Sequence, residues 1–337
     1  MTKIKGDIDR RSRLYKFLKD RELWKAAGIS SHPELYVTRL GGSHEVYLVY
    51  DGRSHKKFIL KSFLDGGHEK ACRYMEKEYE RLKQADRLIN HHCWVHVARP
   101  IYKSKDGCFF VEQYVHGTVL GHYMKEAMSR GRGGTLYDNL TMLAGFFALL
   151  HKASGEQHRA DISGVEEELA RHAEQASHEG AMTRGELHEV KRLIGEACSD
   201  GLLEDARRSL VHGDANPSNF LYNDGRLYVI DMERAGYKDP AYDLGMMAGE
   251  LFHYAMYYNG DPYSADPFIG HMYWTYAGNF RDQPDTFSRL TRRNPLYMAN
   301  SLLRVARQPY FSRHYKRRLA FHAKECLKSL KRSKDKA

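Results

Sequence analysis

The sequence lacks the long apolar segments that membrane proteins and secreted precursors carry. Its longest apolar run covers residues 142–150, whereas a membrane-spanning helix needs roughly 20 such residues. No apolar region follows the first five residues, as a secretory signal would require. We therefore expect a cytoplasmic protein without a transmembrane segment.

Cysteine is also scarce. Five cysteines are scattered along the 337 residues, and their number is odd. Disulfide-stabilised domains of secreted proteins carry even sets of cysteines within short sequences. A disulfide framework is therefore not expected, and the composition favours a reducing compartment.

Positive charge, by contrast, is in excess. The net charge is +10, and residues 311–337 contribute ten Lys or Arg against two acids. Three interpretations fit this segment: a solvated helix face, peripheral contact with an anionic membrane, or contact with a phosphorylated or nucleic-acid partner. The solvated face is the simplest, and nucleic acid is not an expected partner.

The most informative stretch is residues 210–231. An Asn-Asp-Gly sequence at residues 223–225 lies between two apolar, β-prone runs, which is a strong signal for a β-hairpin. A hairpin brings the residue before its first strand close to the residue after its second. Asn219 and Asp231 are therefore expected to lie together. Asp214 lies just upstream, on a segment whose glycine and proline disfavour a helix.

The chemistry of these three side chains points to phosphate transfer. Carboxylate and amide oxygens are hard ligands that suit Mg²⁺, which commonly keeps water and substrate phosphate in its other positions. A carboxylate that does not bind the metal can accept a hydroxyl proton. The stretch therefore predicts a Mg²⁺ site with an adjacent base.

The stretch also resembles the aminoglycoside phosphotransferase and choline kinase family, which are small-molecule kinases with a protein-kinase-like fold. The resemblance rests on a His-Gly-Asp sequence, on the spacing of Asp214 and Asn219, and on the downstream Asp231. By this resemblance Asp214 is the catalytic residue, and Asn219 and Asp231 are the metal ligands. His212 and Asp243 would support the loop by hydrogen bonds.

The N-terminal third of the sequence is predicted to form a small sheet and one long helix. Strands are expected at residues 35–40, 46–50 and 58–63, and the helix at residues 69–86. Lys61 lies on the third strand, and Glu78 is the one acid on the apolar stripe of the helix. A carboxylate turned inward needs a partner, so the two resemble the family's phosphate-gripping pair. The alternative is a Glu78 side chain that reaches solvent at the edge of the stripe.

Two further segments are assigned by the same resemblance. Gly41, Gly42 and Ser43 form a turn ahead of the lysine strand, where backbone N–H groups would cover phosphate. Backbone groups from Glu112 to Val115 would hydrogen-bond an adenine edge at the hinge between two lobes. Taken alone, the first segment is no more than a turn and the second no more than an edge strand.

Together these features predict an α+β fold, with two lobes like those of a protein kinase. Residues 1–115 would form the N-lobe, with a helical lead-in and the nucleotide phosphate grip. Residues 116–337 would form a larger, mainly helical C-lobe with the catalytic loop, metal site and acceptor site. Helices are expected at residues 6–27, 137–151, 268–281 and 294–331, and a polar pair of helices at residues 161–199.

The predicted activity is transfer of the γ-phosphate of ATP, or of GTP, to a hydroxyl of a small molecule, with Mg²⁺. The acceptor would be a sugar, an amino alcohol or an aminoglycoside-like compound. Glu233 stands where the aminoglycoside branch tends to have glycine, which favours a metabolite; it would touch Mg²⁺ or acceptor, or pair with Arg234. Two alternatives stay open: a kinase of an envelope glycan or lipid-linked saccharide at the membrane surface, and a nucleotide-binding scaffold or nucleic-acid binder without turnover.

Overall fold

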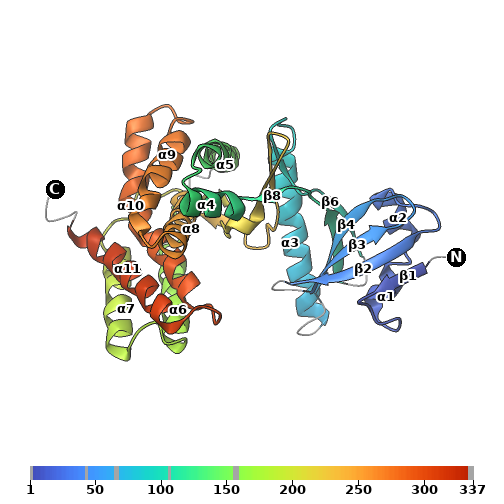
Figure 1. Ribbon diagram of the computed structural model, residues 1–337, viewed down its shortest axis with the longest axis horizontal. Helices are drawn as coiled ribbons and strands as arrows, with labels where there is room; N and C mark the ends of the chain where they lie inside the picture. Colours follow the sequence, from blue (N-terminus) through green and yellow to red (C-terminus); the bar gives the residue numbers. More distant parts are fainter. Residues whose placement is uncertain (1–2, 42–44, 64–67, 105–107, 155–158, 333–337) are drawn as a thin grey trace. The chain divides into compact units, whose positions relative to one another are not determined.

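The chain divides into two compact units. A computed structural model describes residues 3–41, 45–63, 68–104, 108–154 and 159–332. The first unit is Met1–Gly117 together with Tyr228–Glu233, and the second is Thr118–Leu227 together with Arg234–Ala337. Figure 1 follows the chain from blue at the N-terminus to red at the C-terminus.

In its described residues, the first unit is built on a six-stranded sheet with the order β1-β2-β3-β4-β7-β6. The strands are β1 (Lys3–Gly6), β2 (Glu34–Leu40), β3 (Glu45–Asp51), β4 (Lys57–Ser62), β6 (Pro100–Lys103) and β7 (Phe109–Gln113). Neighbouring strands are antiparallel except β1, which runs parallel to β2. The unit also contains α1 (Arg13–Phe17), α2 (Arg21–Ala27), α3 (His68–Ile89) and β5 (Val95–Val97) (Figure 1).

Alternation along β4 separates the core of this unit from its polar face. Phe58 and Leu60 are buried in one hydrophobic cluster with Leu18 and Leu23, which come from the region of α1 and α2. Successive side chains of a strand point to opposite faces, so Lys61 lies on the other side of the sheet from this cluster. The sequence pattern thus fixes which face of β4 can carry a functional group.

The helical lead-in expected at residues 6–27 is present as two short helices, not one. The chain leaves the first helix after Phe17, and Asp20 begins the second as its N-cap. The Asp20 side chain accepts a hydrogen bond from the backbone N–H of Glu22 at 2.9 Å. Such a cap satisfies an otherwise unpaired N–H and favours a new helix start over continuation.

Helices dominate the second unit. They are α4 (Leu120–Arg130), α5 (Gly134–Ala153), α6 (Ile162–His178), α7 (Arg184–Ser199), α8 (Ala241–Tyr258), α9 (Asp266–Ala277), α10 (Gln283–Ala306) and α11 (Arg313–Arg332). The 3-10 turns η1 (Pro217–Asn219) and η2 (Pro262–Ala265) and the strands β8 (Thr118–Val119), β9 (Ser209–Val211), β10 (Phe220–Asn223) and β12 (Gly236–Lys238) join them. Every side chain of α8 from Ala241 to Phe252 is buried. The prediction of a sheet-rich N-lobe and a larger helical C-lobe is confirmed.

The predicted hairpin turn is also confirmed. β11 (Arg226–Val229) follows β10 after the two turn residues Asp224 and Gly225. Their φ angles are 48° and 69°, and a type I′ hairpin turn requires positive φ at both central residues. The Asn-Asp-Gly sequence therefore accounts for the tight turn, because aspartate and glycine tolerate these φ angles.

The single helix expected at residues 294–331 is wrong. The structure has α10, which ends at Ala306, and α11, which begins at Arg313. Pro309 lies between them, and proline can neither donate a backbone hydrogen bond nor fit inside a helix without distortion. Among the described residues, no helix is both long enough and apolar enough to cross a membrane.

No disulfide framework was expected, and the structure has one disulfide that the sequence did not indicate. Cys72 of α3 and Cys108, just before β7, form a disulfide with their Cα atoms 4.7 Å apart. The two residues are 36 positions apart, and they meet because α3 packs against β6 and β7. Spacing in the sequence does not reveal this packing. Cys93, Cys198 and Cys326 are free thiols.

Candidate active site

Lys61 is the centre of a charge cluster in the first unit. It lies near the end of β4 and is 6% exposed. Its Nζ donates to Glu78 Oε1 at 2.7 Å and to Asp231 Oδ1 at 3.1 Å. It also lies 3.7 Å from Glu112 Oε1. The structure places the expected partner Glu78 in contact with Lys61 and adds two further carboxylates.

Strand register explains how Glu112 reaches the lysine. β4 pairs with β7 so that Ile59 lies opposite Glu112 and Lys61 opposite Phe110. Opposed residues share a face of the sheet, as do residues two apart on one strand. Glu112 and Lys61 are therefore diagonal neighbours. Sequence reasoning gave only the backbone of Glu112 a role, although an acid inside an apolar strand is itself a signal that a buried partner is needed.

Burial and charge set the protonation of this cluster. Burial alone lowers the pKa of Lys61, but the charges of Glu112, Glu78 and Asp231 outweigh it and raise that pKa well above the ordinary lysine value. Burial raises the pKa of Glu112 to about 7, against the opposing charge of Lys61. Burial also raises the pKa of Glu78. Lys61 is therefore charged at neutral pH, whereas Glu112 exchanges its proton near neutrality.

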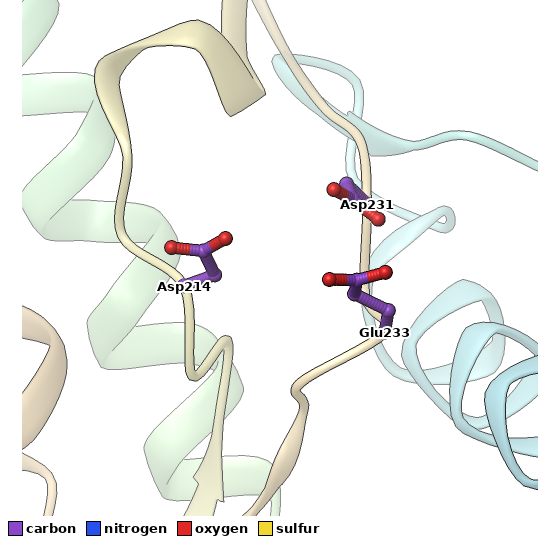
Figure 2. Close-up of side chains that lie close together, drawn as sticks. All are labelled: Asp214, Asp231 and Glu233. Carbon is purple, nitrogen blue, oxygen red and sulfur yellow. The ribbon is translucent and has the colours of Figure 1, made fainter. Parts of the chain in front are cut away.

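Asp231 has an unusual backbone conformation. Its φ is 63°, which is uncommon for a residue other than glycine, and such strain gathers at functional sites. Figure 2 shows Asp231 and Glu233 on the segment that follows β11, and Asp214 on the loop that follows β9. Arg81 of α3 donates to the backbone carbonyl of Glu233 at 2.8 Å. Contacts within the first unit thus hold this segment in place.

In the second unit, Asp243 holds the loop at residues 212–219. The backbone N–H groups of His212 and Gly213 donate to its two carboxylate oxygens at 2.7 and 3.0 Å. His151 Nε2 lies 3.2 Å from the same carboxylate. Burial alone raises the pKa of Asp243, but the hydrogen bond and charge of His151 outweigh it and lower that pKa. His151 itself is buried, and its other ring nitrogen lies 2.9 Å from the hydroxyl of Tyr276.

Gly213 is required by a close backbone approach. Its φ is 78°, and a Cβ at this position would lie 2.1 Å from the carbonyl oxygen of Arg234. No side chain fits at that distance from a backbone atom, and only glycine adopts this φ without strain. The glycine of the His-Gly-Asp sequence therefore lets the loop pass against the segment that contains Arg234.

Asn219 and Asp214 are joined within the same loop. Asn219 is 7% exposed, and its Nδ2 donates to the backbone carbonyl of Asp214 at 3.1 Å. Because the amide nitrogen is used on the loop, Oδ1 is the end of the side chain that can serve as a metal ligand. Ser218 Oγ lies 3.4 Å from that oxygen.

Arg304 is a site residue that sequence reasoning missed. It lies in the last turn of α10, forms an ion pair with Asp214, and donates from Nη2 to Glu250 Oε1 at 2.8 Å. Burial alone lowers the pKa of its guanidinium, but the charges of Glu250 and Asp214 outweigh it and raise that pKa. Arg304 and Asp214 are 90 positions apart. An arginine in the middle of an apolar helical run was the only local signal.

A pocket of about 260 Å³ opens beside Asp214 in the second unit. The lining residues come from the loop at residues 212–219, the segment after β11, α8, the end of α10 and the α10–α11 connection: Asp214, Asn216, Arg234, Glu250, His253, Tyr254, Arg304, Val305, Arg307, Gln308, Tyr310 and Phe311. A hydroxyl compound held here would lie beside the predicted base. The pocket therefore has the position expected of an acceptor site.

Four other predicted residues belong to the first unit. Gly41 follows β2 and is exposed, and Val115 follows β7 and is half-buried. Gly42 and Ser43 lie outside the described residues. The assignment of all four to nucleotide binding stays a prediction.

The basic helix α11 is paired in part with acids of α7. Lys324 donates to Glu189 at 3.2 Å, and Lys328 lies 3.5 Å from the same carboxylate. Lys316, which is buried, donates to Glu179 at 2.7 Å. Some of the positive charge that the sequence concentrates here is therefore neutralised within the second unit.

Solved structures of three small-molecule kinases are similar over nearly the whole chain. An ethanolamine kinase from Plasmodium vivax has 15% identity and a TM-score of 0.56, covering 94% of this chain and 89% of its own. A choline kinase from Streptococcus pneumoniae has 16% identity and a TM-score of 0.55, covering 94% and 100%. An aminoglycoside phosphotransferase from Alicyclobacillus acidocaldarius has 15% identity and a TM-score of 0.51, covering 89% and 92%. At these identities the similarity establishes the fold alone.

The comparison with protein-family models shows which family the chain belongs to. None of the curated proteins compared with the chain matches it. The model of the phosphotransferase enzyme family matches residues 37–273, which include Lys61, the loop with Asp214, and Asp231. Arg304 lies beyond the matched span. Because the match covers well over half of the chain, the protein belongs to the phosphotransferase enzyme family.

Proposed function

We propose that the protein transfers the γ-phosphate of ATP to a hydroxyl group of a small molecule. The observation that supports this most is the cluster around Lys61, whose Nζ contacts Glu78 at 2.7 Å and Asp231 at 3.1 Å. Phosphoryl transfer needs a fixed cation for the phosphate oxygens and a carboxylate for the metal. Family membership supports the same activity.

Asp214 is the base in this proposal. The acceptor hydroxyl oxygen forms a bond to the γ-phosphorus, and the bond from that phosphorus to the bridging oxygen of ADP breaks. The hydroxyl proton passes to the Asp214 carboxylate. The two backbone hydrogen bonds to Asp243 fix the loop, and Arg304 orients one oxygen of Asp214. Positioning of this kind supplies most of the catalysis in such reactions.

The residues present fit a Mg²⁺ ion as cofactor. Asn219 Oδ1, the Asp231 carboxylate and the Glu233 carboxylate are hard oxygen donors, which Mg²⁺ prefers. The metal, when bound with nucleotide, would neutralise the phosphate charge. Lys61 would hold the α- and β-phosphates, and backbone groups from Glu112 to Val115 would bind the adenine edge.

The test is Mg²⁺-dependent release of nucleoside diphosphate by the purified protein across a panel of alcohols. The panel includes sugars and sugar phosphates, hydroxy acids, choline, ethanolamine and aminoglycosides, with ATP and GTP compared. Asp214→Asn is expected to lower acceptor-stimulated release by about 100-fold or more, because general bases contribute about 10² to 10⁴.

Asp224→Asn is the matched control. Asp224 is an exposed acid of the hairpin turn with φ of 48°, a conformation that asparagine adopts readily. Its variant is expected to match the wild type. Equal release by wild type and Asp214→Asn, with every acceptor, would contradict the proposed activity.

A further inference from the structure

The pocket beside Asp214 is lined by more basic than acidic side chains. Three arginines, Arg234, Arg304 and Arg307, face two carboxylates, those of Asp214 and Glu250. Both carboxylates contact Arg304. Arg307 therefore adds to the pocket lining a positive charge that is separate from this three-residue cluster.

Arg307 is the arginine whose surroundings most call for an anion. It is the C-cap residue of α10 and is half-buried, and its Nη1 donates to the neutral side chain of Gln175. Within the part of the chain that the structure describes, no carboxylate lies within 4 Å of this guanidinium. Partial burial and then the charges of Arg234, Arg304 and Arg171 lower the pKa of Arg307, and the charge of Asp214 offsets only part of this effect. A bound anion would relieve this repulsion.

The position of α10 accounts for only part of this arrangement. The C-terminal end of a helix favours basic residues because of the helix dipole, and Arg304 and Arg307 both lie at that end. The dipole does not require a basic residue to line a pocket next to the predicted base, however. A third arginine, Arg234 from the segment after β11, lines the same pocket, and its Nε lies 4.0 Å from Asp214 Oδ2.

A cationic acceptor fits this pocket poorly. Tyr254, Tyr310 and Phe311 also line it, and aromatic faces can bind a quaternary ammonium group. Ammonium groups that seek a carboxylate partner would find both carboxylates of the pocket already in contact with Arg304. The aromatic faces serve equally well to pack the carbon skeleton of an uncharged ring.

We infer that the acceptor is a hydroxyl compound that carries an anionic group, a phosphate or a carboxylate, which Arg307 and Arg234 bind while the hydroxyl faces Asp214. This inference rests on the proposed function and names its substrate class. The planar guanidinium matches both anions because it can donate two parallel hydrogen bonds to either. Polycationic aminoglycosides and choline are excluded as preferred acceptors.

The test compares ligands that share one skeleton and differ in charge. The full-length protein, saturated with ADP and Mg²⁺ so that the nucleotide site is filled, is titrated with ribose 5-phosphate, ribonate, ribose and choline in a calorimeter. At least one of the two anions is expected to bind more tightly than ribose and choline. Which anion binds identifies the group as phosphate or carboxylate.

Variants at Arg307 show whether the binding occurs in this pocket. Arg307→Gln is expected to weaken binding of the anion by about tenfold or more, as loss of a charged hydrogen bond predicts. Arg307→Lys keeps the charge but loses the planar fork, so its affinity for the anion should lie between those of the wild type and Arg307→Gln. Arg289→Gln is the control, because Arg289 is an exposed arginine of the same helix that pairs with Asp285. Circular dichroism checks that each variant is folded.

Three results would overturn the inference: tighter binding of ribose or choline than of both anions, no binding of either anion, or equal effects of Arg307→Gln and Arg289→Gln. None of these results bears on whether the protein binds nucleotide and turns it over through Asp214. Loss of Mg²⁺-dependent ADP binding in the wild type would instead count against the proposed function itself. The two failures are therefore distinguishable.

Discussion

Each of the two units has a buried cation among the carboxylates of its predicted site residues, Lys61 in the first and Arg304 in the second, but the two clusters are balanced differently. Lys61 contacts three carboxylates, those of Glu78, Glu112 and Asp231. Arg304 contacts two, those of Asp214 and Glu250. The first cluster therefore has the larger excess of negative charge, and burial raises the pKa of Glu112 to about 7 there. The second adjoins two further arginines, Arg234 and Arg307.

This difference shows which ligand each cluster lacks. An excess of carboxylates is relieved by a divalent cation, which would accompany the nucleotide phosphates. An excess of guanidinium groups is relieved by an anion on the acceptor. The residue types agree with this division, since lysine is a flexible point charge and arginine a rigid planar fork.

The largest effect on stability is expected from removing the cation of the first cluster. Lys61→Met leaves buried carboxylates without their partner, and breaking such a pair costs about 3 to 5 kcal/mol. Urea unfolding at neutral pH measures the loss. The loss should shrink in acid, because Glu78 and Glu112 then take up protons.

Lys57→Met is the control for this prediction. Lys57 is an exposed lysine of the same strand, and exposed substitutions change stability by about 0.5 kcal/mol or less. If Lys61→Met were no less stable than Lys57→Met, the contacts of Lys61 with the three carboxylates would not stabilise the fold.

A second prediction concerns pH and Glu112. Its pKa is raised from an ordinary 4.5 to about 7. Between these values the folded protein keeps a proton that the unfolded chain has lost, so stability falls as pH rises through this window. Each unit of pKa difference corresponds to about 1.4 kcal/mol, so the free energy of unfolding should fall by about 3 kcal/mol. This fall is complete above pH 7.

Glu112→Gln should remove this slope. Urea unfolding of the nucleotide-free wild type and variant between pH 4.5 and 8 measures it, and the difference between the two curves isolates Glu112 from other groups. Parallel curves would show that Glu112 is not the group whose proton uptake is linked to folding.

The smallest effect is expected in the second cluster. Glu250→Gln keeps an oxygen acceptor for Arg304 but removes one of its two charges, and Asp214 still balances the guanidinium. We expect a loss of about 1 to 2 kcal/mol in unfolding free energy. Asp285→Asn, which breaks an exposed pair with Arg289 on α10, should cost about 0.5 kcal/mol or less. Identical losses in the two variants would remove the distinction between a buried and an exposed pair.

Local sequence predicted the parts of the site that local chemistry determines. The hairpin at Asp224 and Gly225 follows from residues that tolerate positive φ. Alternation and helical periodicity, together with the family resemblance, indicated that Lys61 and Glu78 form a pair, and the two side chains are in contact.

Sequence reasoning failed where a contact depends on packing between distant segments. The ion pair of Arg304 with Asp214 spans 90 positions, and the disulfide of Cys72 with Cys108 spans 36. The side chain of Glu112 meets Lys61 only because of the register between β4 and β7. None of these pairings has a periodic signature, since each is fixed by how whole elements pack.

The most direct test of the account separates nucleotide binding from turnover with one variant in each unit. The affinity for ATP with Mg²⁺ and the rate of acceptor-stimulated diphosphate release are measured for Lys61→Met and Asp214→Asn. The account predicts that Lys61→Met weakens ATP binding and turnover together, whereas Asp214→Asn loses turnover with an unchanged Kd for ATP. It would be contradicted if Lys61→Met bound ATP as the wild type does, or if Asp214→Asn lost ATP binding to the same extent as Lys61→Met.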